Sequence, residues 1–287
     1  MSTMTHEPDT PMFDPDAWAL SDQERDLAAV AREIGQEKIA PRAAEYDRAA
    51  AFPIENYSDM YDAGLMGICI PKAHGGHGLS VRGYAVVAAE IGRYCGSTAL
   101  TWNMHVCSCL WSGALTDDLD MAEADRHHHE TTRAIHYRRI LDDGAIYAQP
   151  FSEGGAAAAD TVAFGTTALR VDGGWIVNGK KIFASLAGSA DYYGVLCSEL
   201  QNPNDRSSRG STLYLAIPAT SDGLTVAGDW DPLGMRGTVS RNLLFEDVFV
   251  PDGSELMPSG IYFKAASQWP HMFMTLTPAY MGQAQAA

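Results

Sequence analysis

The chain has 287 residues, of which 46% are hydrophobic and 20% are charged. This length and composition allow a substantial buried core and exclude an intrinsically disordered chain. The formal net charge of −16 argues against binding to nucleic acid or to an anionic membrane, because both partners need a basic protein surface.

The N-terminal segment, residues 1–20, has the composition of a mobile tail. It contains three prolines and four acidic residues, and it has no lysine or arginine. A signal peptide begins with basic residues and continues with an apolar stretch, so none is predicted. No apolar run in the sequence approaches the ~20 residues that a transmembrane helix needs.

Residues 21–143 have the pattern of an all-α domain. Ser21 and Glu24 form a capping-box pattern at the start of a first helix, and Pro41 is expected to bend or interrupt that helix near its end. A second helix is predicted over 54–63, immediately before a glycine that suits a helix C-terminus.

Two later stretches of this domain differ in polarity. Residues 97–111 are apolar nearly all round, which predicts a buried helix. Residues 116–136 are polar and charged, and we interpret them as an exposed connection with some helix. Three adjacent histidines lie within the run 126–130, but adjacent side chains on a helix point in different directions. We therefore interpret this run as a solvated face and predict no metal site.

Residues 144–253 consist of short segments rich in β-branched and aromatic residues, which predict strands. Asp172–Gly174 and Asn178–Gly179 are typical of hairpin turns. Residues 254–287 return to a helical pattern, and their end resembles the middle of a helix because no Gly, Asn or Pro closes it. The predicted fold class is α+β: an N-terminal all-α domain, a middle β-barrel-like domain and the start of a C-terminal helical bundle.

The cysteines include no C-x-x-C pair, and several lie in apolar runs. We expect free, buried thiols in a reducing compartment, and hence a cytoplasmic protein. The five cysteines are Cys69, Cys95, Cys107, Cys109 and Cys197.

Three pairs of segments, in the same order along the chain, resemble the acyl-CoA dehydrogenase family. Each alone is weak, but their spacing and the helical-then-strand layout make the set specific. The resemblance covers about residues 20–287. The segments are Gly64–Pro71 with Gly75–Ser80, Tyr147–Gly155 with Asp172–Ser185, and Trp230–Thr238 with Phe245–Pro251.

The resemblance implies a flavin-dependent oxidoreductase. In the family, an acyl thioester loses a proton from its α carbon and passes a hydride from its β carbon to N5 of FAD. The electrons go on to electron-transfer flavoprotein, and the enzymes are homo-oligomers, tetramers or dimers. We therefore expect an acyl-CoA or similar substrate and a role in fatty acid metabolism.

The resemblance also implies which residues bind the flavin. Phe151 and Ser152 would meet the edge of the isoalloxazine ring, Ser185 would place a hydroxyl donor near N5, and Phe183 would pack against the ring. The family commonly has Trp and Thr where this chain has Phe183 and Ser185, so the chemical type is kept. The full set of implied cofactor-binding residues is Phe151, Ser152, Gly155, Phe183, Ala184 and Ser185.

Positions of the buried helix correspond to those that face the acyl chain in the family. Helical spacing allows all of them on one broad face, where they would line an acyl pocket. The alternative is that each is a core residue, as a lone histidine on an apolar helix usually is. The implied substrate residues are Thr101, Trp102, His105 and Cys109.

Two features depart from the family pattern. The family has a hydroxyl near a phosphate where this chain has Ala156–Ala159, and it offers an Asp and an Arg to CoA where this chain has 268–273 without either. The family's catalytic base is a Glu in a C-terminal helical domain beyond residue 287, so no catalytic residue is assigned. Glu153 is expected to order its loop. We expect either a fragment or a second chain that supplies the rest.

Two alternatives to the dehydrogenase stay open. A flavin-dependent monooxygenase of the same fold would use reduced flavin and O2 and would need no base, and the missing CoA contacts favour it. A non-catalytic partner subunit is the other. The Leu233–Arg236 signature favours the dehydrogenase. Within that signature, we expect Arg236 to form a structural ion pair.

Overall fold

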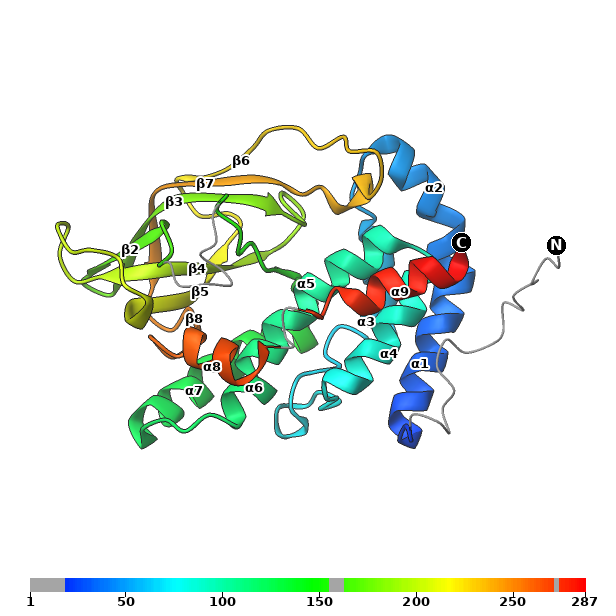
Figure 1. Ribbon diagram of the computed structural model, residues 1–287, viewed down its shortest axis with the longest axis horizontal. Coiled ribbons are helices and arrows are strands. Elements are labelled where there is room, and N and C mark those ends of the chain that lie inside the picture. The colour runs from blue at the N-terminus through cyan, green and yellow to red at the C-terminus, as the bar shows by residue number, and fades with distance from the viewer. Residues whose placement is uncertain (1–18, 155–162, 271–273) are drawn as a thin grey trace.

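The computed structural model describes residues 19–154, 163–270 and 274–287. Its helices and its sheet form two neighbouring regions, with the last helix packed back against the helical region (Figure 1). The helices are α1 (Asp22–Ile34), α2 (Ala40–Ala49), α3 (Ile54–Asp62), α4 (Val81–Gly92), α5 (Gly96–Ser112), α6 (Ala114–Asp117), α7 (Glu123–Asp143), α8 (Tyr262–Gln268) and α9 (Thr277–Ala286). The strands are β1 (Tyr147–Ala148), β2 (Thr167–Val171), β3 (Gly174–Ala184), β4 (Tyr192–Leu200), β5 (Thr212–Pro218), β6 (Leu224–Ala227), β7 (Arg241–Pro251) and β8 (Glu255–Met257).

The start of the helical region follows the predicted capping box. The Ser21 amide donates to Glu24 Oε2 at 2.8 Å, and the Glu24 amide donates to Ser21 Oγ at 3.3 Å. The predicted irregularity near Pro41 is found as a π-helical turn. This turn, Gly35–Ile39, interrupts the α-helical pattern between α1 and α2, and Pro41 follows it in the first turn of α2.

Residues 116–136, predicted as an exposed connection with some helix, are more helical and more buried than expected, because most of them belong to the long helix α7. The helix buries His129, Arg133 and His136. Arg133 bonds to Asp117 at 2.7 Å and to Glu130 at 2.5 Å, so its charge is paired where it is buried. A hydrophobic pattern cannot show this kind of burial, because the buried residues are polar.

The eight strands form one sheet in the order β6-β7-β3-β2-β4-β5-β8, with β1 paired to β4. The described sheet is open, with β6 and β8 at its edges, so the barrel-like prediction holds only loosely. The Asp172–Gly174 signal does mark the turn between β2 and β3. Asn178–Gly179 does not mark a hairpin. It lies inside β3 at a register shift, where Gly179 packs against Thr166 with no room for a Cβ atom.

The domain boundaries predicted at residues 143 and 253 stay predictions, and the elements near them are as follows. Helix α7 ends at Asp143, and the sheet extends to β8, a few residues past the predicted boundary. Leu20, assigned to the tail, is buried against Ala28 and Val86. The rest of the predicted tail lies outside the described residues, apart from Ala19.

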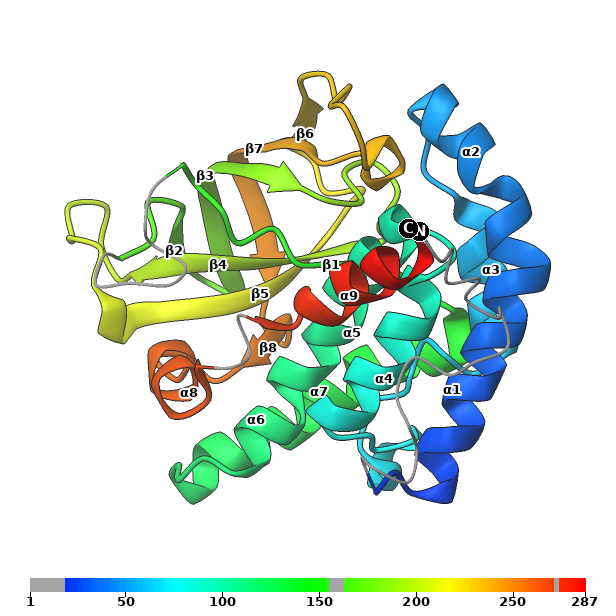
Figure 2. The same ribbon diagram turned by 45° about the vertical axis from the view of Figure 1, so that its right-hand side comes forward.

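Helix α9 packs closely on α4. A Cβ atom on Gly92 would lie 2.4 Å from the Ala279 carbonyl oxygen, and one on Gly282 would lie 2.2 Å from the Ala89 carbonyl oxygen. The two backbones therefore touch directly. This packing brings the start of α9 beside α5 and the near end of the sheet (Figure 2). Among the described helices, none combines the length and the apolar character that crossing a membrane requires.

Candidate active site

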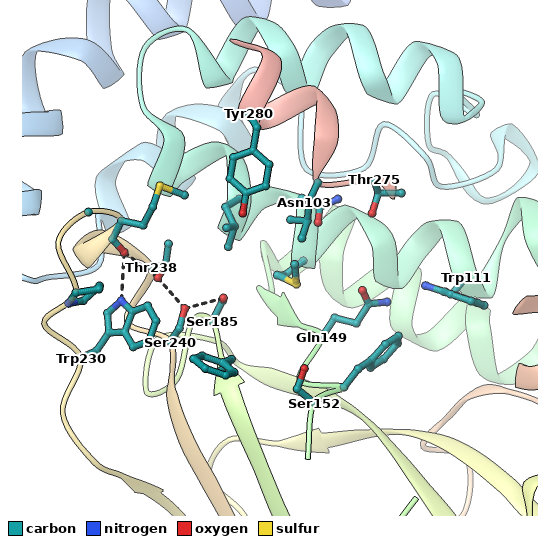
Figure 3. A pocket seen from close by; sticks show the side chains of 18 residues that line it. Asn103, Trp111, Gln149, Ser152, Ser185, Trp230, Thr238, Ser240, Thr275 and Tyr280 are labelled. Carbon is teal, nitrogen blue, oxygen red and sulfur yellow. Dashed lines mark hydrogen bonds between the residues drawn. The ribbon is translucent and has the colours of Figure 1, made fainter. Parts of the chain in front are cut away.

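A cavity of about 570 Å³ lies where α5, the start of α9 and one end of the sheet meet. Its walls come from distant parts of the chain (Figure 3). The lining residues are Leu100, Asn103, Met104 and Trp111 of α5; Gln149, Phe151 and Ser152 after β1; Phe183 and Ser185 at the end of β3; Trp230, Pro232, Gly234, Met235, Thr238 and Ser240 before β7; and Thr275, Leu276 and Tyr280 at α9.

Phe183 forms an exposed aromatic wall of the cavity. The pairing of β3 with β7 shifts register between Lys181 and Ala184, so a bulge turns Phe183 out of the sheet. Its φ of +49° is unusual for a bulky residue, and its side chain is 64% exposed. The Trp230 ring lies edge-on to it, at 6.2 Å between ring centroids. A strained, exposed aromatic residue at a cavity is typical of a ligand-binding wall.

A chain of hydroxyls runs along the wall beside Phe183. Ser185 Oγ lies 2.8 Å from Ser240 Oγ, which lies 2.7 Å from Thr238 Oγ1. Thr238 in turn donates to the Met235 carbonyl oxygen at 2.9 Å. The Leu186 amide donates to the Thr238 carbonyl oxygen at 2.9 Å, which ties the turn after β3 to the loop before β7.

The segment after β1 forms the next wall. The Ile182 amide donates to the Ser152 carbonyl oxygen at 2.8 Å, so this segment runs beside β3. The Phe151 ring lies edge-on to Trp111, at 6.2 Å between ring centroids, and edge-on to Tyr214, at 5.5 Å. Phe151 is half-buried and Ser152 is exposed.

Glu153 anchors this segment, as expected. Its carboxylate accepts from the Gly165 and Thr166 amides at 2.7 and 3.0 Å and from Lys181 Nζ at 2.6 Å. Burial acts to raise the pKa of Glu153, but the Lys181 ammonium and the amide donors outweigh burial and hold that pKa below its ordinary value. Lys181, in β3, is fully buried.

Helix α5 presents a different face to the cavity from the one predicted. Leu100, Asn103, Met104 and Trp111 line the cavity. None of Thr101, Trp102, His105 and Cys109 is among the lining residues, and all four are fully buried in the core. One residue is about 100° around a helix, so a shift of a single position exchanges the lining face for the core face. The assignment of these four to a substrate pocket stays a prediction that this cavity does not support.

His105 is a core residue with both ring nitrogens satisfied. The Tyr147 amide donates to Nδ1 at 3.0 Å, so Nε2 carries the proton and donates to the Met66 carbonyl oxygen, also at 3.0 Å. Burial lowers the pKa of His105 to about 4. Trp102 likewise donates to the Leu65 carbonyl oxygen at 3.2 Å and stacks on Tyr84. The bonds to Leu65 and Met66 hold α5 against the loop that follows α3.

The described part of the lining contains no acid or base suited to proton abstraction. Among the described residues that line it there is no Asp, Glu, His, Lys, Arg or Cys, and Tyr280 is its one titratable side chain. Its polar groups are hydroxyls, two side-chain amides and two indoles. The described part of the cavity therefore binds and orients a ligand through neutral hydrogen bonds and aromatic surface.

Arg236 forms the expected structural ion pair and does not face the cavity. It bonds to the Asp47 carboxylate, and its Nε donates to the Asp47 carbonyl oxygen at 2.7 Å. Another of its nitrogens donates to the Pro232 carbonyl oxygen at 3.1 Å. The pair fastens the loop that carries Trp230, Met235 and Thr238 to α2.

Ala184 is fully buried at the end of β3, beside the cavity and not in its lining. Gly155, Ala156–Ala159 and 271–273 lie outside the described residues. The five cysteines are free, and all except the half-buried Cys95 are buried. No metal-binding cluster is found in the described part of the chain.

The solvated interpretation of the histidine run is wrong for one of its members. His129 is 1% exposed, and its Nε2 lies 2.8 Å from the Ser112 carbonyl oxygen and 2.9 Å from Thr116 Oγ1. His128 lies 3.0 Å from Glu255 and is largely exposed. The run belongs to α7, so only part of it faces solvent.

Sequence reasoning missed Trp111, Trp230, Thr238 and Ser240 as lining residues. Thr238 lies in one of the segments that carry the resemblance, and Ser240 follows it by two positions. Thr238 ends a 3-10 turn and Val239 has a left-handed backbone (φ +43°), so no simple periodicity pairs Thr238 with Ser240. The contact of Ser240 with Ser185, 55 residues away in sequence, has no local signal.

The cavity fits a planar heteroaromatic group. An exposed ring and a strained turn lie on one side, hydroxyls lie along an edge, and aromatic side chains lie opposite. An isoalloxazine ring has this combination of flat apolar faces and a polar edge. The fit rests on Phe183, Ser185, Ser152 and Trp111 as they lie in this structure.

Comparisons with known proteins agree with the geometry. Residues 21–114 match the family of acyl-CoA dehydrogenase N-terminal domains, and residues 148–248 match the family of acyl-CoA dehydrogenase middle domains. The human mitochondrial short-chain specific acyl-CoA dehydrogenase is 30% identical over 245 residues, which cover 84% of this chain and 55% of that protein. The chain spans a little over half the length of the curated relatives that it matches.

Two solved structures illustrate the likeness in fold. FMN-bound TdsC from Paenibacillus sp. A11-2 superposes with a TM-score of 0.73 and 25% identity, covering 91% of this chain and 62% of that one. Butyryl-CoA dehydrogenase from Megasphaera elsdenii gives a TM-score of 0.72 at 23% identity, covering 93% and 64%. The α+β fold class and the predicted family resemblance are confirmed.

Proposed function

This chain belongs to the acyl-CoA dehydrogenase family, and on that premise we propose that it is a flavin-dependent oxidoreductase acting on an acyl thioester. The cofactor is FAD, held in the cavity by Phe151, Ser152, Phe183 and Ser185. When bound, the flavin supplies the acceptor for a hydride from the β carbon of the substrate. The α proton leaves to a base, and a carbon–carbon double bond remains.

One observation supports the proposal above the others. A bulge in β3 turns Phe183 into the cavity, with 64% of its side chain exposed, directly beside the Ser185 hydroxyl. An exposed aromatic face next to a hydrogen-bonding edge is what a flavin ring needs, and nothing in the described core requires Phe183 to be there. The relatives that match this region are acyl-CoA dehydrogenases.

Substrate and partners follow from the same premise. We propose an acyl-CoA or a similar thioester as substrate, and electron-transfer flavoprotein as the acceptor of the electrons. Leu233, fully exposed at the rim, and Met281 and Tyr280 of α9, which are 42% and 47% exposed, give the cavity side of the molecule apolar surface for an oligomeric contact. A homo-oligomer is therefore part of the proposal.

The test begins with the purified protein and FAD. We expect fluorescence quenching on binding, and slow bleaching of the flavin absorbance when acyl-CoA is added without oxygen. The neutral lining formed by the described residues predicts that residues 1–287 alone turn over poorly, because general-base help is typically worth ~10²–10⁴ in rate. Efficient acyl-CoA oxidation by this chain alone would show that a base has been overlooked, with Glu153 and His105 the first to re-examine.

A second candidate function is supported by the neutral lining itself. A flavin monooxygenase needs no α-proton base, and TdsC, a structure of which is described as dibenzothiophene monooxygenase, shares this fold. The two candidates separate in one experiment. Bleaching of oxidised flavin by acyl-CoA supports the dehydrogenase. Oxygen consumption that depends on reduced flavin and an aromatic substrate, without acyl-CoA bleaching, supports the monooxygenase.

A further inference from the structure

The hydroxyl chain in the cavity wall ends at a group that cannot donate. Its four oxygens, in order, are Ser185 Oγ, Ser240 Oγ, Thr238 Oγ1 and the Met235 carbonyl oxygen, with separations of 2.8, 2.7 and 2.9 Å. Figure 3 shows the chain running along one edge of the cavity. Ser185, Ser240 and Thr238 are each less than 10% exposed, so bulk water does not compete freely for these bonds.

This arrangement fixes the direction of every hydrogen in the chain. The three oxygen–oxygen contacts each need one hydrogen, and the three hydroxyls supply one hydrogen each. The carbonyl oxygen has no hydrogen to donate. Thr238 therefore donates to Met235, Ser240 donates to Thr238, and Ser185 donates to Ser240. The Met235 carbonyl oxygen also accepts from the Trp230 indole at 3.2 Å and from the Thr238 amide at 3.1 Å, and the Thr238 hydroxyl makes the shortest of these contacts.

We propose that Ser240 and Thr238 are positioning residues that keep the Ser185 hydrogen turned away from the cavity, so that Ser185 accepts a hydrogen bond from the bound ligand. The family resemblance implied the opposite, a hydroxyl donor near flavin N5. The identity of the ligand rests on the proposed function. In oxidised flavin N5 has no hydrogen to donate, and in two-electron-reduced flavin it has one, so this wall favours reduced over oxidised flavin.

The backbone around the chain holds the oxygens in place independently of the hydroxyls. The Leu186 amide bonds to the Thr238 carbonyl oxygen at 2.9 Å, and the Ser185 amide bonds to the Phe183 carbonyl oxygen at 3.0 Å. Removing one hydroxyl of the chain should therefore redirect the Ser185 hydrogen while its oxygen stays in position. This separates the proposal from a merely structural role for Ser240.

The first test needs no flavin. Neutron diffraction on deuterium-exchanged crystals of the ligand-free protein would show the hydroxyl deuterium of Ser185. We expect it on the line toward Ser240 Oγ, with the Ser240 deuterium directed at Thr238. A Ser185 deuterium directed into the cavity would overturn the proposal.

The second test measures the affinities of the protein for oxidised and for reduced flavin. The ratio of these affinities sets the midpoint potential of the bound flavin, so the potential can be measured instead. Ser240→Ala frees the Ser185 hydrogen to face the cavity, so the ratio of affinities should shift about five- to tenfold toward oxidised flavin, a fall of ~20–30 mV. Thr238→Val should shift it in the same direction, and Thr238→Ser, which keeps the hydroxyl, should not.

A double variant shows whether the effect passes through Ser185. In a Ser185→Ala background, Ser240→Ala should cause no further change in potential. An unchanged potential in the single Ser240→Ala variant, or an equal shift in both backgrounds, would overturn the proposal. If the unaltered protein binds neither form of flavin, the proposed function fails, and the flavin preference is overturned with it. The neutron result still decides the direction of the hydroxyl chain.

Discussion

Two ion pairs hold two walls of the same cavity, and they differ mainly in burial. Lys181 and Glu153 lie 2.6 Å apart, with side chains 0% and 11% exposed. Arg236 and Asp47 join the loop before β7 to α2, with side chains 25% and 36% exposed. The same kind of contact therefore positions both walls, but its energetic weight should differ greatly between them.

The surroundings of the two pairs explain the difference. Lys181 Nζ also donates to the Leu196 carbonyl oxygen at 2.6 Å and lies over the Phe164 ring, so water cannot replace a lost partner. Burial lowers the pKa of Lys181, and Glu153 opposes that shift. Arg236, in contrast, keeps backbone carbonyl acceptors and partial access to water when its carboxylate partner is removed.

The largest expected effect comes from breaking the buried pair on one side only. Lys181→Met leaves the Glu153 carboxylate without its cation, and the free energy of unfolding should fall by about 3–5 kcal/mol, measured by urea denaturation. The matched control is the double variant Lys181→Met with Glu153→Gln, which removes both charges and should recover part of the loss. Equal losses in the single and double variants would show that the charge pairing is unimportant.

Acid tests the same pair without mutation. The folded pKa of Glu153 is below its ordinary value of 4.5, so the unfolded state binds the proton more readily. The stability that the pair contributes is therefore present above pH ~4.5 and is lost as the pH falls through the folded pKa. The quantity to measure is the difference in unfolding free energy between the unaltered protein and the double variant. A difference that stays constant from pH 6 to pH ~3 would contradict this assignment.

The third change leaves both ion pairs intact and removes an aromatic side chain from the cavity lining. Phe183→Ala should weaken flavin binding by about 1 kcal/mol, roughly fivefold, because a stacked ring is lost. The side chain is mostly exposed, so thermal stability without flavin should hardly change. Phe249→Ala, a half-exposed residue of β7 outside the cavity lining, is the control and should leave flavin affinity unaltered.

The smallest effect is expected at the exposed pair. Asp47→Asn should lower the free energy of unfolding by no more than about 1 kcal/mol, because both side chains already reach water. The change should be seen in the loop, as altered fluorescence of Trp230, whose indole bonds to the Met235 carbonyl oxygen. If Asp47→Asn lowered the free energy of unfolding as much as Lys181→Met does, burial would not explain the difference between the two ion pairs.

The sequence predicted those site residues that lie in short continuous motifs. Phe151, Ser152, Phe183 and Ser185 belong to two such motifs, and the structure brings all four to the cavity. The α+β order and the buried helix α5 were also predictable, because they depend on composition and periodicity. The capping box at Ser21 was predictable for the same reason: its partners are three residues apart.

Other features depend on contacts that no local pattern encodes. The choice of face on α5 depends on which side the sheet and α9 occupy, so a one-position error moved the predicted lining from Leu100 and Met104 to Thr101 and His105. The burial of His129 and Arg133 depends on polar partners at the end of α5 and in α6. Lys181 follows another lysine in the sequence, and only the fold distinguishes the buried one from its neighbour.

The glycines between α4 and α9 have a consequence for how this cavity can change over evolution. Where Gly92 and Gly282 let two backbones touch, any added carbon must displace a whole helix, because no side chain is there to yield. Helix α9 carries Tyr280 into the cavity, and Leu276 precedes it. Substitutions at Gly92 or Gly282, which do not contact a ligand, can therefore change the shape of the ligand cavity. Descendants of this protein would then acquire a new specificity through a change in helix packing.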